Sequence, residues 1–204
     1  MGPKRTHPLG TRKPAHGQPS GSLEIMVRTS RPLACPQCVR ARKTCANEGI
    51  DVLTGPDYKD IVVESLRYCQ DKKGLLLYEW TIMTNHVHLL ASSQEGFSLA
   101  DILRDMKKFT SGKIHTAIKE HPGESRREWM LALLKDAGEA NPHNAGFQLW
   151  QQSNQPLLVS TPAEVDRVVE YIRMNPVQEG IVDSPEAYCY SSAYEPGKLR
   201  LEEL

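Results

Sequence analysis

The hydrophobic pattern of the chain changes near residue 50. Residues 1–34 are rich in Pro, Gly, Ser, Thr, Arg and Lys and show little hydrophobic periodicity, a composition typical of disorder. The weak strand candidate LEIMV (23–27) interrupts that stretch. From Ile50 onward, hydrophobic residues recur at helical or strand spacing. The pattern therefore predicts a basic, largely disordered segment over 1–48 and one folded domain over 49–204.

Three helices are predicted in the first part of the folded region. Residues 57–74 place five side chains on one face, and Gly74 suits the position after a helix end. Ser98 is a predicted N-cap, with Asp101 three residues later as a variant of the capping box, for a helix that ends near residue 121. Residues 125–140 predict a third helix. The shared face of the first helix comprises Tyr58, Ile61, Val62, Leu66 and Cys69.

A fourth helix carries the strongest start signal. Thr161 is the predicted N-cap, Pro162 takes the first helical position and Glu164 completes a capping box. Because the residue before a proline avoids helical geometry, Pro176 predicts that this helix ends at Asn175.

Strands are predicted at 49–54, 75–83, 86–93 and 147–152, with a tight turn at Thr84-Asn85 that makes 75–93 a hairpin. A βαβ unit followed by a hairpin partner and further helices is typical of an α+β fold. We therefore expect a ferredoxin-like antiparallel sheet with helices on one face.

The net charge is zero, but its distribution is uneven. Residues 1–48 hold nine Lys/Arg and two Glu, whereas the rest of the chain holds 16 Lys/Arg and 23 Asp/Glu. An acidic folded region argues against non-specific binding of duplex DNA but leaves room for a local basic channel. Five cysteines at irregular spacing, no apolar run long enough to span a membrane and no secretory signal predict a cytoplasmic protein without membrane partners.

His86 and His88 are the first candidate functional residues. In a strand, alternate residues point the same way, so their Cα atoms lie roughly 6.5–7 Å apart on one face. Two imidazoles at this spacing can hold a divalent ion if a third ligand comes from elsewhere. The alternative is two surface histidines, or two with satisfied hydrogen bonds, because the tripeptide alone is a weak pattern.

Tyr171 and Asn175 are the second pair. They lie one helical turn apart, beside the buried stripe of the fourth helix. A phenol needs activation to act as a nucleophile at neutral pH, and a nearby divalent ion can polarise its target. The alternative is a tyrosine at the edge of the core and an asparagine that caps the helix.

Basic side chains predict where DNA binds. The candidates lie along the second helix, at the start of the third and beside Tyr171, although a solvated helix face explains the same charges. They are Arg104, Lys107, Lys108, Lys113, Arg126, Arg127 and Arg173.

Five segments occur in order: IMTNHVHLL (82–90), MKKFTS (106–111), LWQQSNQP (149–156), YIRMNPVQEGIV (171–182) and YCYSSA (188–193). Together they resemble the HUH transposases with a single catalytic tyrosine, the IS200/IS605-like family, and within it the REP-associated tyrosine transposases. The resemblance covers roughly residues 50–204.

The resemblance implies an HUH core in which His86, His88 and Asn175 bind Mg²⁺ or Mn²⁺. Tyr171 would attack a phosphodiester of single-stranded or hairpin DNA and form a 5′-phosphotyrosyl link for strand transfer. Relatives include monomers and dimers, so a homodimer is possible. An alternative is a relative that binds hairpin or single-stranded DNA without catalysis.

The start of the domain departs from the family. Relatives open with an apolar strand where this chain has CPQCVRARKTCANEG (35–49). Either residues 23–29 substitute for that strand, or the domain is damaged. Cys35, Cys38 and Cys45 resemble half of a binuclear zinc cluster, but a tetrahedral zinc site needs four ligands. A zinc site and an incidental cluster in a basic tail both remain possible.

Overall fold

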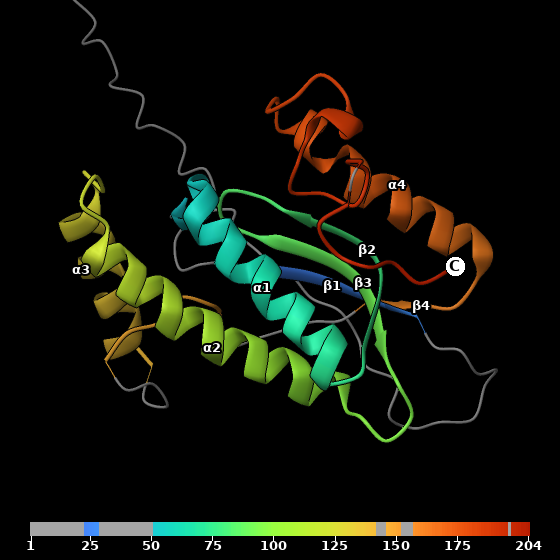
Figure 1. The fold of residues 1–204 in the computed structure, drawn as a ribbon, viewed down its shortest axis with the longest axis horizontal. Coiled ribbons are helices and arrows are strands. Elements are labelled where there is room, and N and C mark those ends of the chain that lie inside the picture. Colours follow the sequence, from blue (N-terminus) through green and yellow to red (C-terminus); the bar gives the residue numbers. More distant parts are fainter. Residues whose placement is uncertain (1–22, 29–50, 142–145, 152–156, 196) are drawn as a thin grey trace, which may run out of the picture.

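The computed structural model describes residues 23–28, 51–141, 146–151, 157–195 and 197–204 (Figure 1). The three cysteines of 35–45 lie outside the described residues, as does the rest of the predicted disordered segment apart from residues 23–28. The elements, in chain order, are β1 (Leu23–Arg28), η2 (Val52–Thr54), α1 (Pro56–Lys72), β2 (Leu75–Ile82), β3 (Val87–Ser93), α2 (Leu99–Glu120), α3 (Arg127–Glu139), β4 (Leu157–Val159), α4 (Pro162–Gln178) and η3 (Pro185–Ala187).

The four strands form one sheet in the order β2-β3-β1-β4. β3 is antiparallel to β2 and parallel to β1, which is parallel to β4, so the sheet is mixed and not wholly antiparallel. β1 pairs with β3 from Leu23 opposite Val87 to Val27 opposite Ala91. Residues 23–28 therefore supply the strand that the segment 35–49 lacks, and the sheet includes residues on both sides of the predicted boundary at 48/49.

β3 separates two hydrophobic clusters. Leu89 and Ala91 belong to the larger cluster, which α1, α2 and α3 share, whereas Leu90 belongs to a smaller cluster with Val168 and Ile172 of α4. Adjacent strand residues point to opposite faces, so α4 lies across the sheet from α1 and α2 (Figure 1). The predicted α+β class is confirmed, but helices cover both faces and not one, because β3 is apolar on both sides.

Most predicted helix signals are confirmed. Gly74 follows α1 with a φ of 68°, and the Ser98 side chain accepts a hydrogen bond from the Asp101 N–H. Thr161 and Glu164 form the complete capping box of α4. None of the described helices is long and apolar enough to cross a membrane.

Three predicted elements are wrong. Val52–Thr54 is a 3₁₀ turn and not a strand, and described residues 147–151 form no strand. α4 continues through Pro176 to Gln178, although Pro176 has no N–H to donate. Burial of Asn175 and Pro176 outweighs that loss, and the Glu179 N–H closes the last turn on the Asn175 oxygen at 3.0 Å.

The C-terminal tail runs beside β2, which is an edge strand of the sheet. The Ile82 N–H donates to the Tyr190 oxygen at 2.9 Å, the Ser192 N–H donates to the Trp80 oxygen at 2.9 Å, and Thr81 and Ser191 form an antiparallel bridge. An exposed edge presents polar groups to which other chains can pair. The tail therefore covers part of this edge.

Lys59 anchors the tail from α1. Its side chain is buried, and its Nζ donates to the Tyr188 hydroxyl at 2.8 Å. The same hydroxyl donates to the Ile82 oxygen at 2.7 Å, so one phenol links α1, β2 and the tail. Burial lowers the pKa of Lys59, because removal from water disfavours the charged amine.

Replacing Tyr188 by Phe should destabilise the protein by about 1–3 kcal/mol, because a buried amine and a buried carbonyl would each lose a partner. Urea denaturation of the full-length chain measures the change in the free energy of unfolding. Tyr68→Phe is the matched control, since Tyr68 is exposed and should change stability little. Equal stabilities for the two variants would contradict the proposed anchor.

Candidate functional site

The two histidines lie where the β2–β3 turn enters β3. The Met83 N–H donates to the His86 oxygen at 2.8 Å, and the Thr84 hydroxyl donates to the Asp51 carboxylate at 2.8 Å, so the turn is fixed on both sides. His86 precedes β3 and is half-buried, while His88 lies within β3 and is 2% exposed. Their ring centroids are 4.6 Å apart and the rings are nearly perpendicular. The two imidazoles therefore converge.

Helix α4 brings the second predicted pair to the same place. Asn175 is buried, and its Oδ1 lies 3.2 Å from His86 Nε2. Tyr171 is 36% exposed, and its ring centroid lies 5.3 Å from that of His88. Four residues that are up to 89 positions apart in sequence thus form one cluster, which we call the HHYN cluster: His86, His88, Tyr171 and Asn175.

The His86 ring has a defined orientation. Its Nδ1 lies 2.7 Å from the Asn85 side-chain oxygen, which can only accept a hydrogen bond. With the proton on Nδ1, the Nε2 of the ring presents a lone pair toward Asn175 Oδ1. Two electron-donating atoms that face each other at this distance suit a shared cation.

The donor set favours one of the two predicted ions. Mg²⁺ prefers a shell of oxygens, whereas imidazole nitrogens combined with an amide oxygen are acceptable to Mn²⁺. Within the described residues, no group of three or more His, Cys, Asp and Glu side chains is arranged to hold a metal. Any ion at the HHYN cluster would therefore need further ligands from water or from a substrate.

Arg173, predicted to bind DNA, contacts the protein instead. Its Nε and Nη2 lie 3.0 Å and 2.9 Å from Glu79 Oε2 on β2. Glu79 is fully buried, and its other oxygen accepts a hydrogen bond from the Ser192 hydroxyl of the tail. Burial raises the pKa of Glu79, and Arg173 opposes that rise. The Arg173 side chain is 46% exposed, but its removal would leave the buried Glu79 carboxylate without a cationic partner, so Arg173 contributes to the fold.

The predicted basic strip on α2 lies across the sheet from the HHYN cluster, because α2 packs on the other face. Arg104 pairs with Asp101 and with Asp105, and Lys107 donates to the Gln151 oxygen at 3.0 Å. Lys108 and Lys113 are exposed. A DNA strand held by these exposed lysines would therefore lie on the other side of the sheet from Tyr171.

Arg126 and Arg127 connect segments of the protein. Arg126 pairs with Glu124 and donates to the Asp51 oxygen at 3.1 Å and to the Thr54 hydroxyl at 2.7 Å. Arg127 donates to main-chain oxygens of Ile118 and His121. These contacts fix the start of α3 and occupy guanidinium groups that the sequence assigned to DNA.

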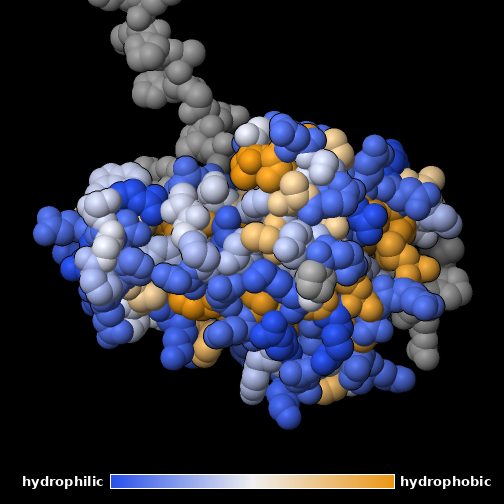
Figure 2. Space-filling model, turned by 45° about the horizontal axis from the view of Figure 1, so that its top comes forward, coloured by the Kyte–Doolittle hydropathy of each residue, from blue (hydrophilic) through white to orange (hydrophobic). Residues whose placement is uncertain are grey.

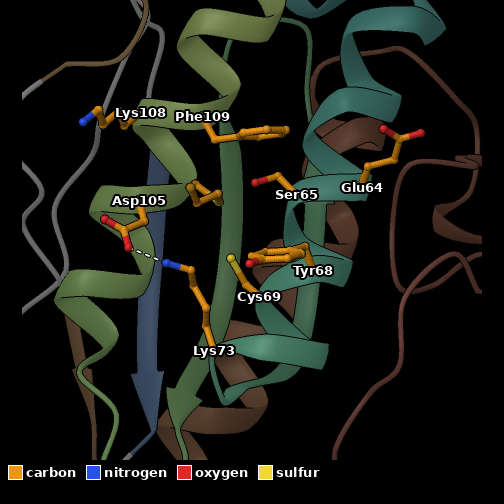
Figure 3. A pocket seen from close by; sticks show the side chains of 9 residues that line it. Glu64, Ser65, Tyr68, Cys69, Lys73, Asp105, Lys108 and Phe109 are labelled. Atoms are coloured by element: carbon orange, nitrogen blue, oxygen red, sulfur yellow. Dashed lines mark hydrogen bonds and ion pairs between the residues drawn. The ribbon is translucent and has the colours of Figure 1, made fainter.

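A hollow of about 700 Å³ lies between α1 and α2 (Figure 3). Tyr68 and Phe109 line it, each about half exposed, and Lys73 pairs with Asp105 at one end. Cys69 also lines it, but burial raises the pKa of this thiol to about 11, which makes it a poor nucleophile at neutral pH. The hollow lies on the α1–α2 side, apart from the HHYN cluster.

The face of the molecule shown in Figure 2 is largely hydrophilic. Figure 2 shows hydrophobic side chains as small patches separated by hydrophilic ones. Large continuous apolar patches are the usual mark of a protein–protein interface. The face shown in Figure 2 has none of that kind.

Two comparisons with known proteins bear on the resemblance found in the sequence. Residues 44–131 match the family model described as IS200-like transposase. The chain also resembles a solved REP-associated tyrosine transposase bound to a REP hairpin, with a TM-score of 0.50, 13% identity and coverage of 79% of this chain and 82% of that chain. The predicted resemblance is confirmed over residues 44–131, which are similar to the IS200-like transposases.

The family match contains His86 and His88 but ends before Tyr171 and Asn175. At 13% identity, the structural likeness shows the fold alone. No curated protein matches the chain. The role of α4 in the site therefore rests on the contacts of this chain.

Sequence reasoning missed Glu79, Asn85 and Ser192. Each had a signal: Glu79 is a lone carboxylate in an apolar strand, Asn85 precedes the histidines, and Ser192 lies in the family segment YCYSSA. Because a buried charge needs a partner, Glu79 in an apolar strand predicts a cationic partner, but the sequence does not identify which residue that is.

Lys107 should make stability depend on pH. Burial lowers the pKa of its amine to about 8, below the ordinary value of 10.5, so between these values the unfolded chain binds more protons. The contribution of Lys107 to stability should therefore rise between about pH 8 and pH 10.5. The free energy of unfolding of Lys107→Met should exceed that of wild type by the largest amount at pH 7, and the excess should shrink toward pH 10.

Urea denaturation of both proteins at several pH values measures this difference. Lys108→Met is the matched control, because Lys108 is the exposed neighbour on the same helix. If the difference in the free energy of unfolding between Lys107→Met and wild type does not change with pH, the prediction is wrong.

Proposed function

We propose that this protein cleaves and rejoins single-stranded DNA through a covalent link to Tyr171. The observation that carries the proposal is the HHYN cluster, in which a partly exposed phenol lies beside two imidazoles and an amide oxygen. The relationship to IS200-like transposases supports a DNA-processing reaction.

His86, His88 and Asn175 would hold a divalent ion, with Mn²⁺ favoured over Mg²⁺ by the donor set. When bound, the ion neutralises charge on the phosphoryl oxygens. Asn85 orients His86 through Nδ1 and so directs the lone pair of Nε2 toward the ion site.

Tyr171 Oη attacks the phosphorus of a phosphodiester. A bond forms between Oη and phosphorus while the bond from phosphorus to the 3′ oxygen breaks. The phenolic proton passes to solvent, and the 3′ oxygen takes up a proton. The products are a 5′-phosphotyrosyl link and a free 3′-OH, and the reverse reaction joins strands.

A hairpin is the proposed form of the substrate. The REP-associated transposase with the same fold was solved with a REP hairpin, and exposed Lys108 and Lys113 give this chain a basic surface away from Tyr171. The predicted homodimer is a further proposal, which light scattering of the purified chain tests.

The alternative, a relative that binds DNA without catalysis, was suggested by the segment 35–49, whose sequence does not predict the expected first strand. Residues 23–28 form a strand beside β3, so that motive is removed. A cleavage assay decides between the two functions.

Incubation with a single-stranded oligonucleotide that carries a hairpin, in the presence of Mn²⁺, should give a covalent protein–DNA adduct in denaturing gel electrophoresis. Tyr171→Phe should give none, because phenylalanine has no nucleophilic oxygen. Tyr68→Phe, an exposed tyrosine on α1, should behave as wild type. No adduct with wild type, or an equal yield with Tyr171→Phe, would overturn the proposal.

Asn85→Ala should weaken Mn²⁺ binding by about 10–100-fold, as loss of an orienting partner of a metal-binding histidine typically does. Calorimetric titration without DNA measures the affinity directly. Asn141→Ala is the control, because Asn141 follows α3 and its side chain contacts Gln148, outside the HHYN cluster. Unchanged Mn²⁺ affinity in Asn85→Ala would show that Asn85 does not orient the ligand.

A further inference from the structure

We propose that Glu79 is a positioning residue, which acts through Arg173 to set the rotation of α4 and hence the position of Tyr171. The inference rests on the proposed function and adds a residue that touches neither DNA nor metal. It also gives the family segment YCYSSA a role, because Ser192 holds the second oxygen of Glu79.

A β-bulge turns Glu79 toward α4. Leu75 and Leu77 of β2 lie in the large cluster with α1, and so do Trp80 and Ile82. Strict alternation would place residue 79 with residues 75 and 77, but the register between β2 and β3 shifts between Leu77 and Glu79. Such a shift re-aims a side chain. Glu79 therefore faces α4, where its carboxylate meets Arg173.

The remaining contacts of α4 with the sheet are mostly apolar. Val165, Val168 and Ile172 pack on Tyr78, Leu90 and Val159. Hydrophobic contacts are non-directional. They select which face of α4 packs on the sheet, but they do not prevent small rotations of the helix about its own axis. The double contact from the Arg173 guanidinium to one carboxylate oxygen is directional.

Arg173 and the reactive residues lie on opposite flanks of the buried stripe. At about 100° per residue, Tyr171 is about 100° to one side of Ile172 and Arg173 about 100° to the other. Asn175 lies on the Tyr171 side, where it contacts His86. The sheet thus holds α4 from both sides, through Glu79 on β2 and through the histidines of the β3 segment.

Small rotations matter for an in-line attack. A roll of roughly 10° about the helix axis moves the end of a tyrosine side chain by roughly 1 Å. Misplacement of a reacting group by about 1 Å can reduce a rate about 100-fold. A fixed rotation of α4 is therefore worth a large factor in rate.

The tail reaches the same carboxylate. The Ser192 hydroxyl accepts a hydrogen bond from the Trp80 N–H at 3.0 Å and donates one to Glu79 Oε1. Because both oxygens of Glu79 are engaged, its side chain has a single orientation in which to receive Arg173. Ser192 thus acts indirectly, by orienting the Glu79 carboxylate that contacts Arg173.

The test compares the rate of adduct formation in a single turnover, at saturating hairpin oligonucleotide and Mn²⁺, for wild type, Glu79→Gln, Arg173→Gln and the double variant. Each single variant should react about 10–100-fold more slowly. The double variant should be no slower than the slower single variant, because both changes break one contact. Arg167→Gln, an exposed arginine on the same helix, is the control and should react as wild type.

The rate constant separates positioning from simple loss of stability. A partly unfolded population lowers the amplitude of the reaction but leaves the rate constant of the folded fraction unchanged. Ser192→Ala removes the hydroxyl that contacts Glu79 Oε1 and the Trp80 main chain but leaves the ion pair of Glu79 with Arg173 in place. It should slow the reaction about 3–10-fold with full amplitude, which keeps the test valid if Glu79→Gln does not fold.

Two results would overturn the inference. One is a wild-type rate constant in Ser192→Ala and in every folded Glu79 or Arg173 variant. The other is weaker DNA binding in Arg173→Gln with wild-type binding in Glu79→Gln, which would make Arg173 a direct DNA contact. If wild type forms no adduct, the proposed function itself fails, and that outcome is distinct from both.

Discussion

Every part of the candidate site depends on the alternation of side chains along β3. One face of this strand packs against α1 and α2 through Leu89 and Ala91, and the other carries His88 and Leu90 toward α4. Successive residues of a strand point to opposite faces of the sheet. An interior strand can therefore bury apolar side chains on one face and carry an imidazole on the other. β1 and β2 hold β3 on both sides, so the position of His88 is fixed by the whole sheet.

The buried carboxylate of Glu79 forms a directional contact between the sheet and α4. Glu79 is fully buried, which is costly unless the charge is paired, and the pairing draws on α4 and on the C-terminal tail. Apolar packing brings α4 to the sheet, while the ion pair gives it one rotation. The tail covers part of the edge of β2 and also joins this network, because Ser192 of the tail and Arg173 of α4 contact the same carboxylate.

The pattern of the sequence predicted individual elements well. Periodicity and caps located α1, α2 and α4, because Gly74, Ser98 and the Thr161–Glu164 box act within a few residues. Predictions failed where distant contacts outweigh local preference. Burial keeps Pro176 inside α4. The LEIMVR segment, only a weak strand candidate by its sequence, is confirmed as an interior strand through its pairing with β3 and β4. The sequence also did not reveal that Arg126, Arg127 and Arg173 have partners within the fold, because charge alone does not identify long-range contacts.

The sequence by itself indicated the resemblance to IS200-like transposases and singled out the four residues of the HHYN cluster, because the spacing of His86 and His88 and of Tyr171 and Asn175 is local. Only the tertiary structure decided that these pairs, 89 positions apart at His86 and Asn175, meet. It also decided that the strip on α2 lies on the far face and that Glu79 turns toward α4 at a bulge. The physical reason is that helices and strands form from short-range preferences, whereas contacts between them depend on how the buried faces pack together.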